Sequence, residues 1–267
     1  MRIRRLGWAG VEIEQQGTTV VIDLLRNGET MRAFVGDVAG PLPAPSAEGA
    51  VAAALVTHLH SDHADPPAIA EALAPDGIVL RPPASTGGGL EAAGLALAEQ
   101  GLAELDRVEV LEPWQTRQVG PFAITAVPAV DGFGDPQSGW HVAAGGASLV
   151  HFGDTLFHGW WWPLAQRLGA PDVALLPING ATISLPHRQP PSERPAVMTP
   201  EDAVSAARIL GAGTLVPIHY DAIQSPPTYV QVDDPVGRLR RAAEQAGVAL
   251  RVLEPGEELE PAAAAAA

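Results

Sequence analysis

The side chains best suited to chemistry in this sequence are four metal-capable groups that lie within the six-residue segment HLHSDH. They are His58, His60, Asp62 and His63. The segment directly follows the small apolar run 51–57, a pattern typical of a buried strand whose carboxyl end opens into a loop. Alternate side chains of an extended segment share a face, so His58 and His60 can point into one site. The chain then turns, which lets Asp62 and His63 face a second position nearby.

The available ligand types limit which metals this segment can bind. The chain has no cysteine, so any metal must be held by imidazole and carboxylate groups, which without thiolate suit Zn, Mn or Fe. A polar surface loop that happens to be rich in histidine is the alternative. Because three of only eight histidines in the chain lie in this one segment, we favour a metal site.

An aspartate and a histidine follow two further apolar runs in the same way. Asp154 stands in the segment HFGDT, and His219 stands in the segment VPIHY. Each signal is weak alone, since Gly-Asp-Thr is also an ordinary turn and a single histidine is more often a structural one. Because three apolar strands each end in a possible ligand, we predict that Asp154 and His219 converge on the HLHSDH segment.

Strand and helix patterns alternate along the elements that must position these residues. Strands are expected at 2–6, 11–15, 18–22, 51–57, 78–80, 108–111, 122–127, 142–144, 148–152, 173–176, 214–218 and 248–253. Helices are expected at 67–74 and 90–100, and two more begin at the cap pairs Thr199-Pro200 and Asp234-Pro235. With no repeat and no domain boundary, the sequence predicts one α/β domain over 1–260 and a low-complexity tail over 261–267.

Charge and hydropathy exclude several classes of partner. The formal charge of −15, from 31 acidic and 16 basic residues, repels phosphate backbones, so we expect no nucleic-acid partner. No run approaches the roughly 20 apolar residues that cross a bilayer, and the start MRIRRLGWAG lacks the features of a signal peptide. We therefore expect a cytoplasmic protein without a membrane span. Nothing in the sequence indicates its oligomeric state.

Taken together, these motifs resemble those of the metallo-β-lactamase superfamily over nearly the whole chain. The similarity is strongest to the single-domain hydrolase branch that includes sugar-phosphate lactonases and N-acylphosphatidylethanolamine phospholipases. Residues 58–63 match its HxHxDH signature, residues 153–155 its bridging-aspartate motif and residues 217–220 its last histidine motif. The segments LLPING (175–180) and MTPEDA (198–203) also look like that branch. The resemblance implies a four-layer αββα sandwich with a dinuclear centre at one edge of its two sheets.

The resemblance also implies which side chains hold the two divalent metal ions. One ion would be held by His58, His60 and Asp131 and the other by Asp62, His63 and His219, with Asp154 bridging them. A water activated by the ions would act as nucleophile on an ester, lactone or phosphodiester of a small molecule. In this arrangement His58, His60 and Asp62 are the residues at the centre of catalysis.

Two positions depart from the family pattern. The family usually carries a histidine after a Val-Pro-Ala-like strand end, where the segment VPAVD here places Asp131. His141, ten residues later, is the alternative ligand. The family's Gly-His-Ala-like segment reads GWA here, with Trp8 at its centre. Because a third carboxylate would make the ions less electrophilic, we expect Zn but predict that Mn or Fe competes better than usual.

Four further residues are candidates for substrate contact: His158, His187, Trp160 and Asn179. Trp160 belongs to the segment GWWWP, which could line an apolar entrance; packing of these indoles onto a sheet is the alternative. For the two histidines, which lie on expected loops, the alternative is a solvated side chain.

Three other functions are compatible with the same motifs. A nuclease is disfavoured by the acidic charge. A catalytically weakened scaffold that binds a metal or ligand is motivated by the departures at Asp131 and Trp8. An iron-dependent oxidoreductase would fit the ligand types, although no flavin-binding segment accompanies them.

Overall fold

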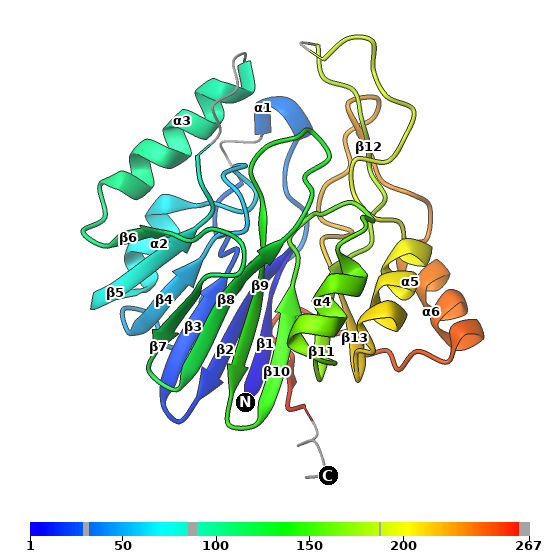
Figure 1. Ribbon diagram of the computed structural model, residues 1–267. Helices are drawn as coiled ribbons and strands as arrows, with labels where there is room; N and C mark the ends of the chain where they lie inside the picture. Colours follow the sequence, from blue (N-terminus) through cyan, green and yellow to red (C-terminus); the bar gives the residue numbers. More distant parts are fainter. Residues whose placement is uncertain (29–31, 85–89, 187, 262–267) are drawn as a thin grey trace.

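Two mixed β-sheets dominate the structure (Figure 1). The computed structural model describes residues 1–28, 32–84, 90–186 and 188–261. A seven-stranded sheet has the order β15-β1-β2-β3-β4-β5-β6, and a six-stranded sheet has the order β13-β11-β10-β9-β8-β7.

The strands of the first sheet are β1 (Arg2–Gly7), β2 (Gly10–Gln15), β3 (Thr18–Ile22), β4 (Val51–Leu55), β5 (Leu73–Arg81), β6 (Val108–Val110) and β15 (Glu258–Leu259). Those of the second are β7 (Thr116–Val119), β8 (Phe122–Pro128), β9 (Ser138–Ala144), β10 (Ala147–His151), β11 (Val173–Pro177) and β13 (Thr214–Ile218). A separate two-stranded ribbon pairs β12 (Thr182–Ile183) with β14 (Tyr229–Val230). The helices are α1 (Arg32–Val35), α2 (Pro66–Ala72), α3 (Leu90–Ala103), α4 (Trp161–Leu168), α5 (Pro200–Leu210) and α6 (Pro235–Ala246).

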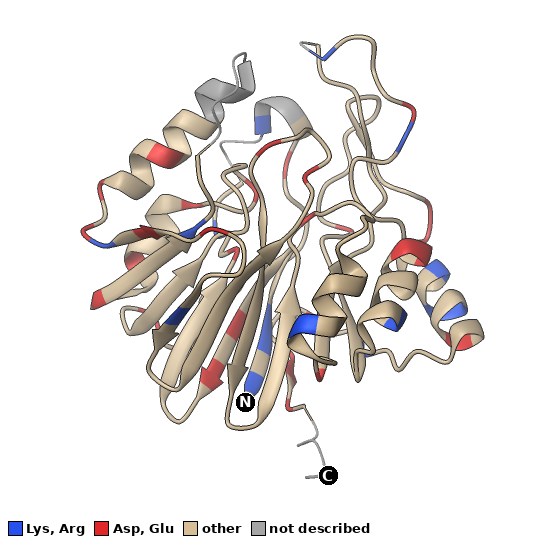
Figure 2. Ribbon diagram, viewed as in Figure 1, with Lys and Arg blue, Asp and Glu red and all other residues tan. Residues whose placement is uncertain are grey.

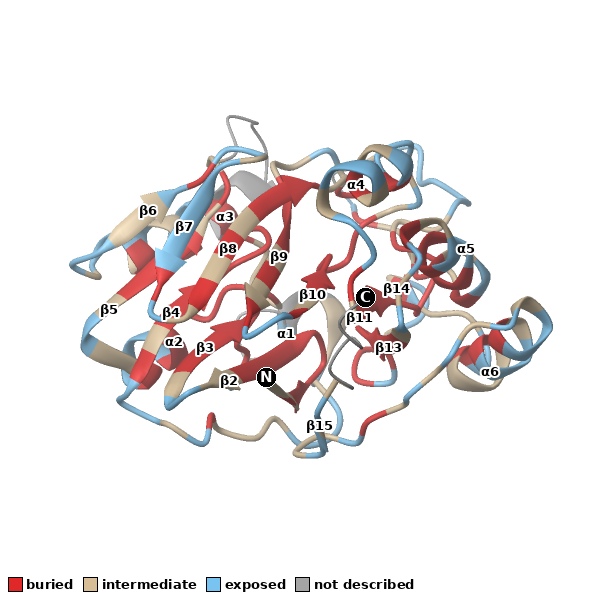
Figure 3. Cartoon of the chain, turned by 60° about the horizontal axis from the view of Figure 1, so that its bottom comes forward, coloured by how far each residue is buried: buried red, intermediate tan, exposed pale blue. Residues whose placement is uncertain are grey.

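Three hydrophobic cores define four layers. The central core lies between the two sheets and contains Ile13, Phe122 and Leu175. A second core joins the first sheet to α2 and α3, and a third joins the second sheet to α4, α5 and α6. Because the sheets pack against these cores, many residues along their strands are buried (Figure 3). Each large apolar side chain so buried contributes roughly 1.5–3 kcal/mol. The layers confirm the predicted αββα sandwich of mixed α/β class.

The sequence signals at the start of α5 and α6 act as expected. The Thr199 side chain accepts from the backbone of Asp202, whose own side chain accepts from Thr199, so that the two form a capping box. The Asp234 carboxylate accepts from the Gly237 amide at the start of α6. These caps satisfy amide groups that would otherwise lack partners at the helix ends.

Parallel pairing brings several strand ends to one edge of the sandwich. In the first sheet β3, β4, β5 and β6 run parallel, and in the second β10, β11 and β13 run parallel. Their carboxyl ends therefore open on the same side, where open α/β sheets commonly bind ligands.

Several predicted elements differ from the structure. The expected strand 248–253 is wrong: only Leu250 bridges β13, through Leu215, and the chain then turns so that the Leu253 carbonyl accepts from Arg5. The strands β7, β12, β14 and β15 were not predicted, because they are short or largely polar and lack a run of apolar residues. The single-domain boundary at 260 stays a prediction, and residues 262–267 of the expected tail lie outside the described residues.

Basic residues are interspersed with acidic ones along the described chain (Figure 2). One of the two densest basic runs lies on α6, where Arg238 pairs with Glu201 and Arg241 pairs with Asp234. These pairings offset the positive charge of that helix, and the absence of a nucleic-acid partner stays a prediction. No helix of the described residues has the length and apolar character needed to cross a membrane.

Candidate metal centre

The predicted ligands lie just beyond the carboxyl ends of four strands. His58 follows β4, Asp131 follows β8, Asp154 follows β10 and His219 follows β13. Gly153 allows the β10 turn to pass close to β4: its φ is +59°, and a Cβ atom there would lie 2.5 Å from the Thr57 hydroxyl oxygen. The glycine of the GDT motif is therefore required by close approach as well as by its backbone conformation.

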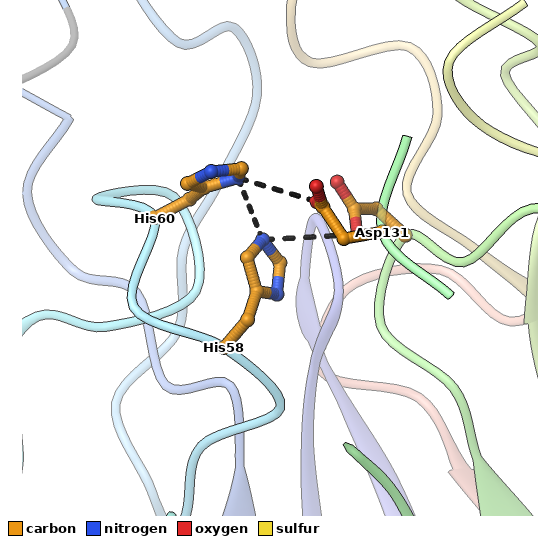
Figure 4. A group of neighbouring side chains, drawn as sticks. His58, His60 and Asp131 are labelled. Atoms are coloured by element: carbon orange, nitrogen blue, oxygen red, sulfur yellow. Dashed lines mark hydrogen bonds and ion pairs between the residues drawn. The ribbon is translucent and has the colours of Figure 1, made fainter. Parts of the chain in front are cut away.

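One candidate metal position, the first position, is formed by His58, His60, Asp131 and Asp154. The Nε2 atom of His58 lies 2.9 Å from Nδ1 of His60 and 3.7 Å from Oδ1 of Asp154, and Nδ1 of His60 lies 3.8 Å from Oδ2 of Asp131. Figure 4 shows His58, His60 and Asp131 pointing toward one another. Zinc–ligand bonds of about 2.0–2.2 Å place the donors of a tetrahedral site roughly 3.4 Å apart, so this spacing fits a metal ion.

The loop after β8 fixes Asp131 in this position. Its Oδ1 atom accepts the backbone N–H groups of Phe133, at 2.7 Å, and Asp135, at 3.0 Å. Its Oδ2 atom is buried without a hydrogen-bond partner in the described chain and faces His60. His141, the alternative ligand, lies on β9 and belongs to no metal-capable group found among the described residues. The geometry therefore favours Asp131.

A second candidate position, the second position, involves Asp62, His63 and His219. Oδ2 of Asp62 lies 3.3 Å from Nε2 of His63 and 3.4 Å from Nε2 of His219. The donor atoms of His63, His219 and Asp154 also lie within 4.8 Å of one another. Asp154 thus has donor atoms close to both positions, as a bridging ligand requires.

Unpartnered buried nitrogen atoms support a cation at the second position. The Nε2 atoms of His63 and His219 are buried and make no hydrogen bond within the described chain, because their contacts with Asp62 lack hydrogen-bond geometry. A buried polar group left without a partner costs about 1–3 kcal/mol. A cation bound between these nitrogens and the Asp62 carboxylate would satisfy all three groups.

Crowding of carboxylates also supports cation binding. Burial, reinforced by the negative charge of Asp131, raises the pKa of Asp154 to about 7. Burial opposes protonation of His60, yet its hydrogen bond to Asp135 and the charge of Asp131 raise its pKa to about 9. For His63 burial also opposes protonation, but Asp62 and the buried carboxylate of Asp23 raise its pKa well above the ordinary value. The pocket therefore attracts positive charge, which divalent ions would supply.

Asp23 orients two histidines and was not predicted from the sequence. It is fully buried, and its Oδ2 atom lies 2.7 Å from Nδ1 of His63. It also accepts the Thr57 hydroxyl at 2.8 Å, which leaves that hydroxyl oxygen to accept from Nδ1 of His58 at 3.1 Å. Both histidines are thereby held with Nε2 toward the site, as partners of metal-binding histidines usually hold them. Asp23 follows the expected strand 18–22, and that position is the signal that could have identified it.

Two further supporting residues lack a comparable signal in the sequence. Gln137 donates from Nε2 to Oδ1 of Asp154 at 3.0 Å and to the Phe152 carbonyl at 3.2 Å. Asp135 lies 3.1 Å from Nε2 of His60 and so fixes that ring with Nδ1 toward the first position. Both act on residues far away in the sequence.

Backbone strain accumulates around the second position. Trp8, Asp23 and His219 have φ angles of +40°, +49° and +57°, the left-handed region that residues other than glycine seldom adopt. Each such residue costs of order 1–3 kcal/mol, and strained backbones gather at functional sites. The surrounding packing must therefore hold these three residues in place.

Among the expected substrate contacts, Asn179 is placed most tightly. It is fully buried, accepts the Ala181 amide on Oδ1 at 3.3 Å and donates from Nδ2 to the Tyr229 hydroxyl at 2.7 Å. Burial and the charges of Asp62 and Asp154 raise the pKa of Tyr229 well above its ordinary value. Tyr229 therefore stays a neutral phenol near the site. The sequence did not point to it.

The other expected substrate contacts divide between packing and exposure. His158 stacks on the buried indole of Trp161 at 4.1 Å between ring centroids, and burial lowers its pKa to about 4. Trp161 also packs edge-on against Phe152, as the packing alternative describes. Trp160 is 45 % exposed and is free to line an entrance. His187 lies outside the described residues.

Comparisons with known proteins agree with this fold and site. Residues 18–220 match the family model described as the beta-lactamase superfamily domain. The fold and the histidine–aspartate cluster thus define a metallo-β-lactamase-type protein. The chain belongs to the β-lactamase superfamily.

Curated relatives carry the description UPF0173 metal-dependent hydrolase. One from Methanopyrus kandleri is 29 % identical, over 97 % of this chain and 100 % of that protein. Another, from Methanoculleus marisnigri, is 32 % identical but matches only 48 % of this chain and about half of its own length (48 %). These proteins are similar to the chain over different extents.

Solved structures extend the likeness in fold. Igni18, described as a novel metallo hydrolase from Ignicoccus hospitalis, has a TM-score of 0.64 and 19 % identity, with 97 % of both chains covered. CmlA, a diiron β-hydroxylase from Streptomyces venezuelae, has a TM-score of 0.70 and 18 % identity, over 97 % of this chain and 53 % of that one. At this identity the likeness shows the fold alone.

Proposed function

We propose that the protein is a metal-dependent hydrolase that uses two divalent ions to cleave an ester, lactone or phosphodiester of a small molecule. The observation that carries this proposal is the convergence of seven imidazole and carboxylate side chains from distant segments, some of whose buried donor atoms have no hydrogen-bond partner among the described residues. The description of the curated relatives as metal-dependent hydrolases supports it.

Each of the two positions has its own set of ligands for one ion, and one ligand is shared. His58, His60 and Asp131 would hold one ion, and Asp62, His63 and His219 would hold the other, with Asp154 shared. When bound, the ions would acidify a water molecule and polarise the scissile bond of the substrate. The chain itself contributes fixed ligand directions, because Asp23, Asp135 and Gln137 hold the rings and the shared carboxylate.

The Asn179–Tyr229 pair provides a polar contact for substrate. Because Asn179 donates its amide N–H to the Tyr229 oxygen, the phenolic O–H is directed elsewhere and can donate to an oxygen atom. Its raised pKa keeps that proton in place at neutral pH. This donor would suit a carbonyl or phosphoryl oxygen of the substrate.

Metal identity follows from the ligand set. Imidazole and carboxylate ligands accept Zn, Mn and Fe, and Asp131 supplies a negative ligand to the first position. We propose zinc as the usual occupant, with Mn or Fe competing better there than at the second position. The structurally similar CmlA, 53 % of whose chain is covered, is described as a diiron β-hydroxylase, which supports iron as an alternative.

Metal analysis combined with a substrate panel tests the proposal. The protein, expressed without added metal, is assayed for bound metal and for turnover of chromogenic esters, lactones and phosphodiesters. We expect two ions per chain and turnover that a chelator abolishes and one metal restores. Tight metal binding without turnover on any panel member would favour the catalytically weakened scaffold. Turnover that survives complete metal removal would contradict metal-dependent hydrolysis.

A further inference from the structure

Trp8 is a buried indole in contact with two of the candidate ligands. Its N–H group donates to Oδ2 of Asp62 at 3.1 Å, and its ring lies 3.9 Å from the His219 ring, centroid to centroid. That Asp62 oxygen is the one that faces Nε2 of both His63 and His219. The indole therefore contacts two ligands of the second position directly: it donates to the Asp62 carboxylate and packs against the His219 ring.

The turn that carries this indole is anchored through its own backbone. Gly7 has a φ of +85°, and a Cβ atom there would lie 2.5 Å from the Pro41 carbonyl oxygen, so the turn between β1 and β2 requires glycine. The Trp8 carbonyl accepts the His219 amide at 2.9 Å. The next carbonyl, of Ala9, lies 2.8 Å from Nε2 of the buried His151. The turn is thus tied to β10 and to the residue after β13.

Two other buried tryptophans show that burial alone does not explain this hydrogen bond. Trp140 and Trp161 are fully buried, yet their N–H groups make no hydrogen bond to any described residue. The Trp8 N–H group, by contrast, is aimed at the Asp62 carboxylate. The imidazoles of His63 and His219 also lie close to this oxygen, and they would themselves face the ion.

We propose that Trp8 is a positioning residue for the second metal position. Its N–H group orients the Asp62 carboxylate, and its ring fixes the plane of the His219 imidazole. An indole N–H donates but has no lone pair for a metal, so Trp8 holds the ligands without competing for the ion. This inference rests on the proposed dinuclear function. It assigns to Trp8 the orientation of the ligands at one of the two metal positions.

Zinc binding to three variants tests the inference. Trp8→Phe keeps an aromatic ring against His219 but removes the N–H group, and Trp8→His restores an N–H donor. Trp161→Phe removes a buried indole N–H group that makes no hydrogen bond to any described residue, and it serves as the matched control. Metal-free protein is titrated with zinc and with cobalt, and the affinities of the two ions are measured by equilibrium dialysis and by the visible absorption of cobalt.

The expected result is a loss of affinity for only one of the two ions. In Trp8→Phe we expect the affinity for one ion to fall about 10–100-fold, as for other partners of metal ligands, while the other ion binds as in the wild type. Trp161→Phe should bind both ions normally, and Trp8→His should recover most of the loss. A Trp8→Phe protein that binds both ions with wild-type affinity would overturn the inference.

The test separates this inference from the proposed function. If the wild-type protein binds fewer than two ions, the dinuclear proposal fails and the role of Trp8 fails with it. If the wild type binds two ions but Trp8→Phe loses both equally, only the positioning role is overturned. Should Trp8→Phe fail to fold by circular dichroism, the decision passes to Trp8→His, in which a 100-fold loss of one ion would contradict a role for the N–H donor.

Discussion

The two candidate metal positions are built in different ways. At the first position, Asp131 is fixed by two amide groups of its own loop, within four residues. At the second position, Asp62 and His63 are held by Trp8 and Asp23, which lie 54 and 40 residues away in the sequence. The Asp131 carboxylate of the first position is therefore fixed by its own loop, whereas Asp62 and His63 of the second position are fixed by distant segments.

This difference suggests where the site can tolerate change. A loop that orients its own carboxylate can exchange one ligand for another without disturbing its neighbours. The second position is surrounded by three left-handed residues, Trp8, Asp23 and His219, whose strain is balanced by the surrounding core. We expect substitutions there to affect ligand geometry more severely.

The largest effect should come from the residue common to both positions. Asp154→Asn preserves the shape of the side chain but removes its charge, so both ions should bind weakly. Since each ion contributes several kcal/mol to the stabilisation of a transition state, turnover should fall about 10³-fold or more. Zinc content and turnover are measured together, with Asp172→Asn as a control, because Asp172 caps the amide of Ser148 away from the site. Retention of both ions in Asp154→Asn would contradict a shared ligand.

Two paired substitutions distinguish the two positions directly. Asp23→Asn should weaken the second ion about 10–100-fold and the first ion less, because Asp23 contacts His63 directly but reaches His58 only through Thr57. Asp135→Asn should weaken the first ion about 10–100-fold, because it removes the carboxylate beside His60. Cobalt titrations followed by absorption resolve the two binding steps. The comparison breaks down if both variants weaken the same ion more than the other.

Local patterns explain how much of the fold was predictable. The apolar runs of β3, β4, β11 and β13 and the cap of α5 are contiguous, so the sequence predicts them to within one or two residues. The ribbon of β12 and β14 pairs two-residue segments far apart in the chain, and no local pattern marks them. The run 248–253 looks like a strand but makes one bridge, and its apolar side chains pack against the two adjoining cores without further strand pairing.

The candidate site shows the same division. Its seven expected ligands stand in short motifs or at strand ends, where residue type and spacing can be recognised, and the structure brings all seven together. Gln137, Asp135 and Tyr229 instead act through contacts that only the assembled fold creates. The role of Trp8 is of this kind too, since its contact with Asp62 depends on the turn between β1 and β2.

A smaller effect should sharpen the contrast in metal preference. Asp131→His replaces a carboxylate by a neutral ligand, so the first position should favour zinc over manganese several-fold more than in the wild type. Competition between zinc and manganese, followed by elemental analysis, measures this ratio. An unchanged ratio of zinc to manganese, or a changed ratio at the second position only, would contradict the proposed difference in metal preference between the two positions.

The smallest effect is expected at the alternative ligand. His141 lies on β9, where burial lowers its pKa, and outside the metal-capable groups found in the described chain. His141→Gln should therefore leave zinc stoichiometry and both affinities unchanged. Loss of one ion from this variant would reassign the first position from Asp131 to His141.

Anomalous diffraction from crystals of the zinc-loaded protein tests the central claim most directly. We predict two zinc peaks about 3.5–4 Å apart, as in other two-metal sites, with the Asp154 carboxylate between them and Asp131 beside the peak nearest His60. Peaks that lie elsewhere, or a single peak that Asp154 does not touch, would contradict the convergence of distant segments on a shared metal centre.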